Sequence, residues 1–381
     1  MMTRYIKFVC LVISLGTAVT SAQFTPTSSS VAFVYVSRAV GGNNYEISAF
    51  AAASNGKLTR VSGSPFPADV QNMAVNGKYL FGTNGIEIDS FAIASDGSLT
   101  EVASINAQQF NNPVGGGPGA LFLDHTGAML YDEDIYGNNG ANNTYQFFDI
   151  EKATGQLNYL GMTKAASTQF WEPLSFTGNN VYAYGSNCYH FDADIFGFER
   201  KSDGTLVELN INPEIPAAKS GSFYCPYLAT ADPTNYVAIS LQPLNANSWQ
   251  PHGPPQLAAY TVDGSGNLTT KSTYSNMPTS SVNSVLDIDM APSGKLLAVG
   301  GTAGLQVFHF NGSNPITHYT GLLTTDEIDQ FFWDNDNHLY AISAKSGKLF
   351  VFTVTPTSVS QAPGSPYTIR QPMNIIVLPK T

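Results

Sequence analysis

Short runs of alternating apolar and polar residues recur along the chain, separated by turns rich in glycine, asparagine or aspartate. Residues 86–102 show the pattern most clearly, because apolar positions such as Ile88 precede an Asp96-Gly97 turn and Leu99 begins a second run. Alternation with a period of two is typical of a half-buried strand, and glycine accepts the positive φ that a tight turn requires. This stretch therefore predicts a β-hairpin.

The hairpin pattern occurs seven times, and a second pair of predicted strands precedes six of the copies. One hairpin alone would be marginally stable in water, so the repetition matters. The repeat is four strands over roughly 40–60 residues, which is typical of a β-propeller blade. The hairpins span residues 47–61, 86–102, 145–160, 195–209, 257–270, 305–319 and 349–362, and the preceding pairs span residues 72–82, 120–132, 174–184, 227–240, 286–300 and 330–343.

The two ends of the chain predict how the ring closes. Before its hairpin, the first copy has only one strand, which starts at Phe33, and residues 373–380 form a single unpaired strand. Adding that strand to the N-terminal three completes a seventh blade and removes the open edges of the ring. We therefore expect an all-β, seven-bladed propeller of four-stranded antiparallel blades, from about residue 31 to residue 378. An open solenoid would need capping repeats and no split blade.

The connections of such a ring alternate between its two faces, and the long ones all fall on the same face. Turns inside the strand pairs are short, whereas the connections between second and third strands and between blades are extended. Because binding residues concentrate on elaborated loops, we expect the binding surface on this loop-rich face. The long connections are residues 132–144, 186–194 and 242–256 within blades, and residues 106–119, 163–173 and 212–226 between blades.

Residues 1–22 resemble a secretory signal peptide rather than part of the fold. Two basic residues precede an apolar run over residues 8–19, which ends in small residues. The run is too short for a comfortable membrane span. We expect cleavage after Ala22, export to the periplasm or the extracellular medium, and a single propeller domain over residues 23–381. An N-terminal anchor that is never cut is the alternative.

The chain is acidic, with a formal net charge of −11. Removing residues 1–22 takes away Arg4 and Lys7 but no acidic residue, so the exported form would carry −13. Such a charge, with few and scattered basic residues, argues against a nucleic-acid or anionic-membrane partner. No later segment approaches the length of an apolar membrane span, and we expect a monomer.

Cys10 lies in the predicted signal peptide, so the exported chain keeps Cys188 and Cys225. Two cysteines in an exported protein favour a disulfide. Both fall in predicted long loops on adjacent blades, so we expect a Cys188–Cys225 bridge on the loop-rich face. Two unpaired, buried thiols are the alternative.

Acidic and aromatic residues gather in the same loops. Acids so placed could bind a hard cation such as Ca²⁺, hydrogen-bond sugar hydroxyls, or act as acid and base. No D-x-D-x-D-G loop is present, so we expect no cofactor or metal, and solvated loop acids are the alternative interpretation. The aromatic residues could stack on sugars or pack between blades. The candidates are Asp132, Glu133, Asp134, His190, Asp192 and Asp194, together with Trp171, Glu172, Tyr189 and Trp249.

The aromatic strands with D-G or N-G turns, and the phrases GSPF at residues 63–66 and GSPY at residues 364–367, resemble a known family. The chain is similar to the lactonase-type seven-bladed propellers, the 6-phosphogluconolactonase/cycloisomerase-2 group, in its exported form. The resemblance covers residues 31–378 and implies a propeller fold. Enzymes of that group open sugar lactones with a His, Glu and Arg set near the mouth of the central channel.

The positions of that catalytic set carry other residues in this chain. The family's histidine corresponds to Gly119, and its G-P-R-H phrase corresponds to residues 224–227, which contain neither Arg nor His. The glutamate position falls near Gln242. We therefore carry over no catalytic residue from the family.

The function that we favour is a non-catalytic, exported propeller that binds a carbohydrate, another small molecule or a protein on its loop-rich face. The missing His, Glu and Arg set supports it. A hydrolase that opens sugar lactones with a rearranged site is the alternative, since the resemblance spans nearly the whole chain. A ring that only docks protein partners is a third possibility, with no sequence feature of its own.

Overall fold

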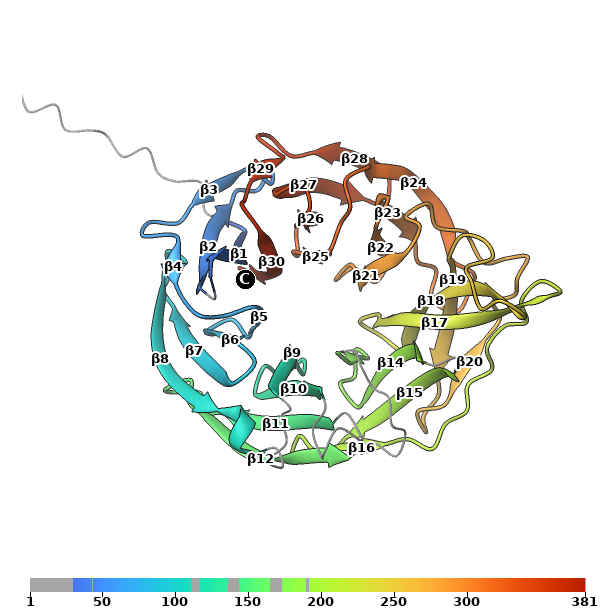
Figure 1. The fold of residues 1–381 in the computed structure, drawn as a ribbon, viewed down its shortest axis with the longest axis horizontal. Helices are drawn as coiled ribbons and strands as arrows, with labels where there is room; N and C mark the ends of the chain where they lie inside the picture. Colours follow the sequence, from blue (N-terminus) through green and yellow to red (C-terminus); the bar gives the residue numbers. More distant parts are fainter. Residues whose placement is uncertain are drawn as a thin grey trace, which may run out of the picture.

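The computed structural model describes residues 30–380, apart from residue 43 and residues 111–116, 136–143, 165–172 and 190–191. Seven antiparallel sheets stand around a central axis, each with one edge strand toward the axis (Figure 1). The predicted all-β, seven-bladed propeller is therefore confirmed. We number the blades 1 to 7 along the ring.

Within each blade, the strands follow one another from the inner to the outer edge of the sheet. Blade 1 contains β30 (Pro372–Pro379), β1 (Ala32–Gly41), β2 (Asn44–Ala52) and β3 (Leu58–Arg60), with β4 (Phe66–Pro67) also paired to β2; blade 2 contains β5 (Asn72–Val75), β6 (Tyr79–Thr83), β7 (Glu87–Ile93) and β8 (Leu99–Asn106), followed by the 3-10 helix η1 (Ala107–Phe110); blade 3 contains β9 (Gly117–Leu123), β10 (Met129–Ile135), β11 (Thr144–Ile150) and β12 (Leu157–Lys164). Blade 4 contains β13 (Ser175–Phe176), β14 (Tyr182–Tyr189), β15 (Asp192–Arg200) and β16 (Leu206–Glu208); blade 5 contains β17 (Ser222–Ala231), β18 (Tyr236–Asn245), β19 (Gln256–Val262) and β20 (Leu268–Thr270); blade 6 contains β21 (Val285–Met290), β22 (Leu296–Gly301), β23 (Gly304–His309) and β24 (Thr317–Thr324); blade 7 contains β25 (Gln330–Trp333), β26 (His338–Ser343), β27 (Lys348–Thr355) and β28 (Ser358–Gln361), with β29 (Tyr367–Thr368) also paired to β27.

The C-terminal strand closes the ring as the sequence predicts. β30 pairs antiparallel with β1, in a register that runs from Ala32 opposite Pro379 to Arg38 opposite Pro372. The innermost strand of blade 1 thus comes from the far end of the chain, and β1 is covered on both edges. This pairing holds blade 1 to blade 7 and leaves the ring without an open sheet.

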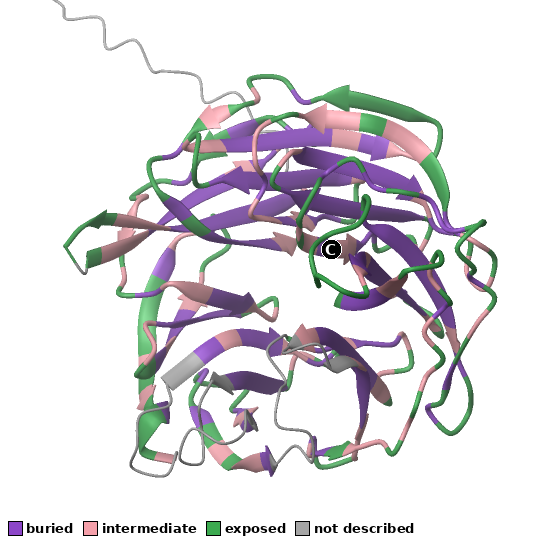
Figure 2. Ribbon diagram, turned by 45° about the vertical axis from the view of Figure 1, so that its right-hand side comes forward, coloured by how far each residue is buried: buried purple, intermediate pink, exposed green. Residues whose placement is uncertain are grey.

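The hydrophobic core lies in layers between the blades rather than in one central mass. Between blades 4 and 5, for example, Tyr184 and Ile195 of one blade pack with Tyr224, Ile239 and Tyr260 of the next. Figure 2 shows that burial follows the inner and middle strands, whereas loops and outer strands are exposed. Middle strands are buried on both faces, so some of them carry apolar residues at successive positions, as residues 296–299 of β22 do.

The D-G turns that define the sequence pattern also hold neighbouring blades together. Tyr35 of blade 1 donates a hydrogen bond from its hydroxyl to the carbonyl of Gly97 in blade 2, at 3.0 Å. Gly97 has φ +87°, and a Cβ there would lie 2.5 Å from the ring of Phe33. Tyr131 and Tyr184 make the same kind of bond, each to a hairpin glycine of the next blade. The turn glycine therefore serves both the hairpin and the contact between blades.

Polar side chains on the innermost strands cover part of the inner sheet edges. The carboxamide of Asn374 in β30 accepts the backbone N–H of Met73, the first-strand neighbour in blade 2, at 3.1 Å. Gln330 of blade 7 accepts the N–H of Ile375 at 2.8 Å in the same way. An edge strand exposes unpaired backbone donors, so these side chains satisfy groups that the sheet cannot.

The two GSP phrases turn out to be structural. The hydroxyl of Ser64 accepts the N–H of Ala49, and that of Ser365 accepts the N–H of Val351, both at 2.8 Å. In each case the following aromatic residue begins a short strand that pairs with the third strand of its blade. The phrase thus ties the connection between blades 1 and 2, and between blades 7 and 1, back onto a sheet.

The strands near the cysteines are longer than the sequence predicts. β14 continues to Tyr189 and β17 starts at Ser222, so Cys188 and Cys225 lie at strand ends and not in loops. The prediction of loop cysteines was wrong because polar residues such as Ser186 and Asn187 continue the pairing of β14 with β15.

No helix among the described residues is long and apolar enough to cross a membrane.

Candidate functional site

The candidate residues that the structure describes lie in different parts of the propeller. Trp171, Glu172 and His190 lie outside the described residues. Asp134 and Asp192 lie in β10 and β15. Among the residues that the structure describes, no three His, Cys, Asp or Glu side chains lie close enough together to hold a metal ion. The Ca²⁺ site stays a prediction, because it includes His190.

Asp132 and Glu133 are buried strand residues of β10. Asp132 accepts the backbone N–H of Gly119 at 2.9 Å. Because side chains alternate along a strand, Asp132 lies on the same face as Leu130, toward blade 2, and Glu133 lies on the same face as Tyr131, toward blade 4. The two carboxylates therefore belong to different layers of the propeller.

Asp194 belongs to the same layer as Glu133. It lies in β15, two residues before Phe196, which packs against blade 3 in the cluster that contains Tyr131. Glu133 and Asp194 thus approach the loop-rich face from opposite sides of the layer between blades 3 and 4. Of the predicted acids, Glu133 and Asp194 therefore share one layer, and Asp132 belongs to another.

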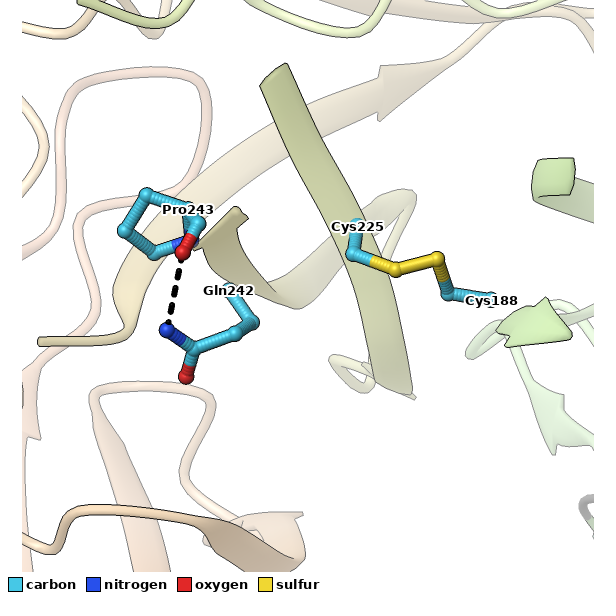
Figure 3. Close-up of a disulfide and its surroundings, with 4 residues drawn as sticks. All are labelled: Cys188, Cys225, Gln242 and Pro243. Carbon is cyan, nitrogen blue, oxygen red and sulfur yellow. Dashed lines mark hydrogen bonds between the residues drawn. A yellow bond between two sulfur atoms is a disulfide. The ribbon is translucent and has the colours of Figure 1, made fainter. Parts of the chain in front are cut away.

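The Cys188–Cys225 disulfide joins β14 of blade 4 to β17 of blade 5, with a Cα–Cα distance of 5.4 Å (Figure 3). The predicted pairing is confirmed. Cys225 is paired in register with Gln242 of β18, so the bridge lies beside the middle strands of blade 5. Such a bridge fixes the relative position of two blades that also meet through side-chain packing and through hydrogen bonds such as that of Tyr184.

A cavity of about 260 Å³ lies next to this bridge, and we call it the disulfide pocket. Its walls come from the Cys188–Cys225 bridge, from blade 5, from the connection between β18 and β19, and from the start of blade 6. Trp249 is the only predicted ligand residue among the described lining residues. The lining consists of Cys188, Cys225, Tyr227, Ser240, Gln242, Leu244, Trp249, Pro251, Pro255, Ser284 and Val285.

A rigid turn places Trp249 at the pocket. The side-chain oxygen of Asn245 accepts the N–H groups of Asn247 and Ser248, and its carbonyl accepts the N–H of Trp249 at 2.8 Å. Trp249 ends this turn with φ +60°, a left-handed conformation that is uncommon for a bulky residue. Its ring packs edge-on against the ring of Phe223, with 4.9 Å between the ring centroids. Strained backbone that the surroundings impose is a recognised feature of binding sites.

Gln242 provides a fixed polar group in the same pocket. Its side-chain nitrogen donates to the carbonyl of Pro243 at 3.1 Å and to the carbonyl of Gly253 at 2.9 Å. Figure 3 shows the amide oxygen turned away from Pro243. Because both partners are carbonyls, the nitrogen must be the atom that faces them. The orientation of the amide is therefore set by the protein.

Two positions that the family resemblance singles out, Tyr227 and Gln242, both line the disulfide pocket, whereas Gly119 lies in β9 of blade 3. Sequence reasoning noted these residues only as replacements for catalytic groups and did not propose them as ligand contacts. Their alignment with the family's catalytic phrases was the signal that could have located the pocket. Among the described lining residues, none is an Asp, Glu, His, Lys or Arg.

Sequence reasoning also missed a pair of acids in the centre of the ring. Asp287 and Asp289 lie two residues apart on β21 and line a second cavity of about 360 Å³ between the innermost strands. Asp287 accepts the N–H of Ile288 and that of Phe331 in blade 7, each at 2.8 Å. Burial raises the pKa of Asp287 to about 7. Burial and the charge of Asp287 raise the pKa of Asp289 well above its usual value.

The fold matches solved structures over nearly the whole chain. A provisionally assigned 6-phosphogluconolactonase from Bacteroides fragilis is 14% identical, with a TM-score of 0.66 over 93% of this chain and 99% of that one. The periplasmic gluconolactonase PpgL from Pseudomonas aeruginosa is 13% identical, with a TM-score of 0.61 over 91% and 99%. This chain therefore has the fold of the lactonase-type seven-bladed propellers. The predicted resemblance is thus confirmed for the fold.

A second provisional 6-phosphogluconolactonase, from Bacteroides uniformis, is 16% identical, with a TM-score of 0.66 over 92% of this chain and 100% of that one. No known family profile matches the chain, and no curated protein matches it in sequence. At these identities the likeness establishes the lactonase-type fold and leaves the chemistry to be argued from the site.

Proposed function

We propose that this chain is an exported, lactonase-like propeller that binds an uncharged small molecule, a carbohydrate being the class that we favour, in the disulfide pocket, without opening lactones. The observation that carries the proposal is the lining of the pocket. Tyr227 and Trp249 provide aromatic surface and Gln242 provides an amide, whereas the described lining contains no Asp, Glu, His, Lys or Arg. Sugars offer apolar ring faces to aromatic side chains and hydroxyls to amides.

The same lining argues against hydrolysis by the family's chemistry. A general acid or base typically contributes about 10²–10⁴-fold in rate, and an oxyanion donor about 10²–10³-fold. Tyr227 and Gln242 stand where the resemblance places the ionisable groups, and neither is a general base at neutral pH. Little acceleration above the uncatalysed reaction would remain.

Export rests on two features of the chain. Residues 1–22 have the layout of a signal peptide. The Cys188–Cys225 bridge is of the kind that forms and persists in oxidising compartments. Together they support a protein that works in the periplasm or outside the cell.

The test is a titration of purified residues 23–381 with a panel of neutral mono- and disaccharides, followed by calorimetry. We expect saturable binding that Trp249→Ala abolishes. Tyr274→Ala is the matched control, because Tyr274 is another exposed aromatic residue and does not line the pocket. Binding unaffected by Trp249→Ala would place the ligand elsewhere and remove the support for this function.

The alternative hydrolase is tested with the same preparation. Glucono-1,5-lactone opening at neutral pH should not exceed the rate in buffer. Turnover that Glu133→Gln or Asp194→Asn abolishes would instead support a lactonase with a rearranged site between blades 3 and 4.

A further inference from the structure

The disulfide pocket offers its ligand one fixed hydrogen-bond acceptor. Both hydrogens of the Gln242 amide are directed to backbone carbonyls, of Pro243 and of Gly253. The amide oxygen is the atom of this group that points away from Pro243 (Figure 3). Since the two bonds prevent the amide from rotating, Gln242 presents an acceptor and cannot turn its nitrogen toward the ligand.

The other polar side chains of the described lining are hydroxyl groups and an indole N–H, which are neutral donors and bring no positive charge to compensate an anion. Ser240 is buried, and its hydroxyl oxygen accepts the N–H of Leu228 at 3.3 Å, so its O–H can offer a ligand only one neutral donor. Burying a charge without an opposite charge or several donors is unfavourable. The described lining residues include no Lys, Arg or His. An anionic group near Gln242 would also face the lone pairs of the amide oxygen.

The size of the pocket further limits the class of ligand that it can hold. Its volume of about 260 Å³ is just below the roughly 300–1,000 Å³ that is common for drug-sized ligands. A single sugar-sized ring with hydroxyl donors fits both this volume and the aromatic walls at Tyr227 and Trp249.

We propose that Gln242 is a specificity-determining residue that makes the disulfide pocket select uncharged, hydroxyl-bearing single-ring ligands and reject their anionic counterparts. This inference rests on the proposed function and adds to it the residue that sets the charge and the hydrogen-bonding character of the ligand. Phosphorylated and acidic sugars are the ligands that the pocket excludes.

The experiment compares matched pairs of ligands on residues 23–381. Glucose, galactose and mannose would each be titrated beside their 6-phosphate and the corresponding uronate, with tryptophan fluorescence and calorimetry as readouts. We expect at least one neutral sugar to bind ten-fold or more tightly than both of its anionic forms. Gln242→Met, which keeps the length of the side chain but removes the amide, should weaken that sugar about three- to tenfold.

Two further variants separate specificity from stability. Gln242→Lys introduces a cation and should raise the affinity for the 6-phosphate relative to the neutral sugar. Gln250→Ala is the control, because Gln250 is an exposed residue in the loop that follows β18 and does not line the pocket. Thermal melts of all variants would check that the fold is intact.

The outcomes distinguish this inference from the proposed function. Sugars that bind through Trp249 with equal affinity in neutral and anionic forms would overturn the role of Gln242 and leave the binding function standing. If Gln242→Met and Gln242→Lys leave the ratio of neutral-sugar affinity to anionic-sugar affinity unchanged, the role of Gln242 is likewise overturned and the binding function stands. If none of these probes binds, the proposed function and this inference both fail.

Discussion

Trp249 has an unfavourable backbone conformation that the surrounding turn imposes on it. A left-handed backbone costs a residue with a Cβ roughly 1–2 kcal/mol, and a glycine or asparagine would avoid most of that cost. The turn is nevertheless well specified by Asn245, which accepts two backbone N–H groups and the N–H of Trp249 itself. The conformation is therefore imposed, and its effect is to hold an aromatic ring at the pocket.

Comparing two substitutions at this residue measures the strain separately from the lost ring. Trp249→Gly and Trp249→Ala both remove the indole and its contact with Phe223, but only glycine relaxes the backbone at φ +60°. We expect Trp249→Gly to be more stable than Trp249→Ala by about 1 kcal/mol in chemical denaturation. Both variants should lose ligand binding. Equal stability of the two would show that the turn is not strained.

The central acids give a pH dependence whose sign follows from their raised pKa values. A carboxyl with a raised folded-state pKa stabilises the fold fully below its unfolded pKa and loses that contribution as the pH rises through the folded value. For Asp287 this window lies between about pH 4 and pH 7. The pKa of Asp289 is also raised well above its usual value, so its ionisation adds to the loss of stability on the alkaline side.

Asp289→Asn removes one of these ionisations while keeping the size of the side chain. We expect the melting temperature of the variant to exceed that of the wild type by a few degrees at pH 8 and to approach it near pH 4. Differential scanning calorimetry across this range provides the measurement. A variant that is less stable at pH 8 than at pH 4, relative to the wild type, would contradict the sign.

At the scale of elements, the disulfide links two strands that belong to different blades. β14 and β17 share the layer that contains Tyr184 and Tyr224, and the bridge links these two strands covalently. A disulfide of this kind contributes about 2–4 kcal/mol to folding stability. It also forms part of the pocket wall, so its loss should affect binding as well as stability.

The double variant Cys188→Ala/Cys225→Ala tests both effects. We expect a loss of about 2–4 kcal/mol in denaturant unfolding and weaker binding of the neutral sugar. Mass spectrometry of the unreduced wild type should find the two cysteines bonded and no free thiol. Complete alkylation of Cys188 and Cys225 without reductant would reject the bridge.

β30 is the element on which closure depends. Ile375, Ile376 and Val377 are buried, and burial of three such side chains contributes roughly 5–9 kcal/mol, comparable to the whole stability of a typical domain. A chain that ends at Gln371 should therefore not melt cooperatively. Removing Thr381 alone, outside β30, is the control. A soluble, cooperatively melting truncation would show that the ring closes without its last strand.

At the scale of the whole molecule, the sequence was sufficient to predict the ring and insufficient to locate the pocket. The blade count follows from a local signal, since each hairpin such as residues 86–102 has its own turn. The closure and the disulfide follow from where single strands and cysteines lie within the repeat. The disulfide pocket depends instead on how the loop that carries Trp249 and Val285 of the next blade come to line the same cavity. No local pattern encodes that arrangement.

The central acids were missed for a related reason. Asp287 and Asp289 alternate with apolar residues, as any half-exposed strand would, and only the curvature of the closed ring places them in its centre. Likewise Glu133 and Asp132 are adjacent in sequence but belong to different layers, because a strand turns successive side chains to opposite faces.

Closure by pairing also means that the chain has no obligatory first blade. Ala32 lies opposite Pro379, and the N–H of Lys380 donates to the carbonyl of Val31 at 2.7 Å, so the two ends of the described chain are neighbours. A short glycine-serine linker could join them, with new termini opened in the exposed turn between Thr357 and Ser358. We expect this circular permutant to fold and to bind the same sugar, because blade 1 becomes covalently continuous and blade 7 becomes the blade that is completed by pairing. A permutant that stays unfolded would show instead that the order in which the blades are made matters.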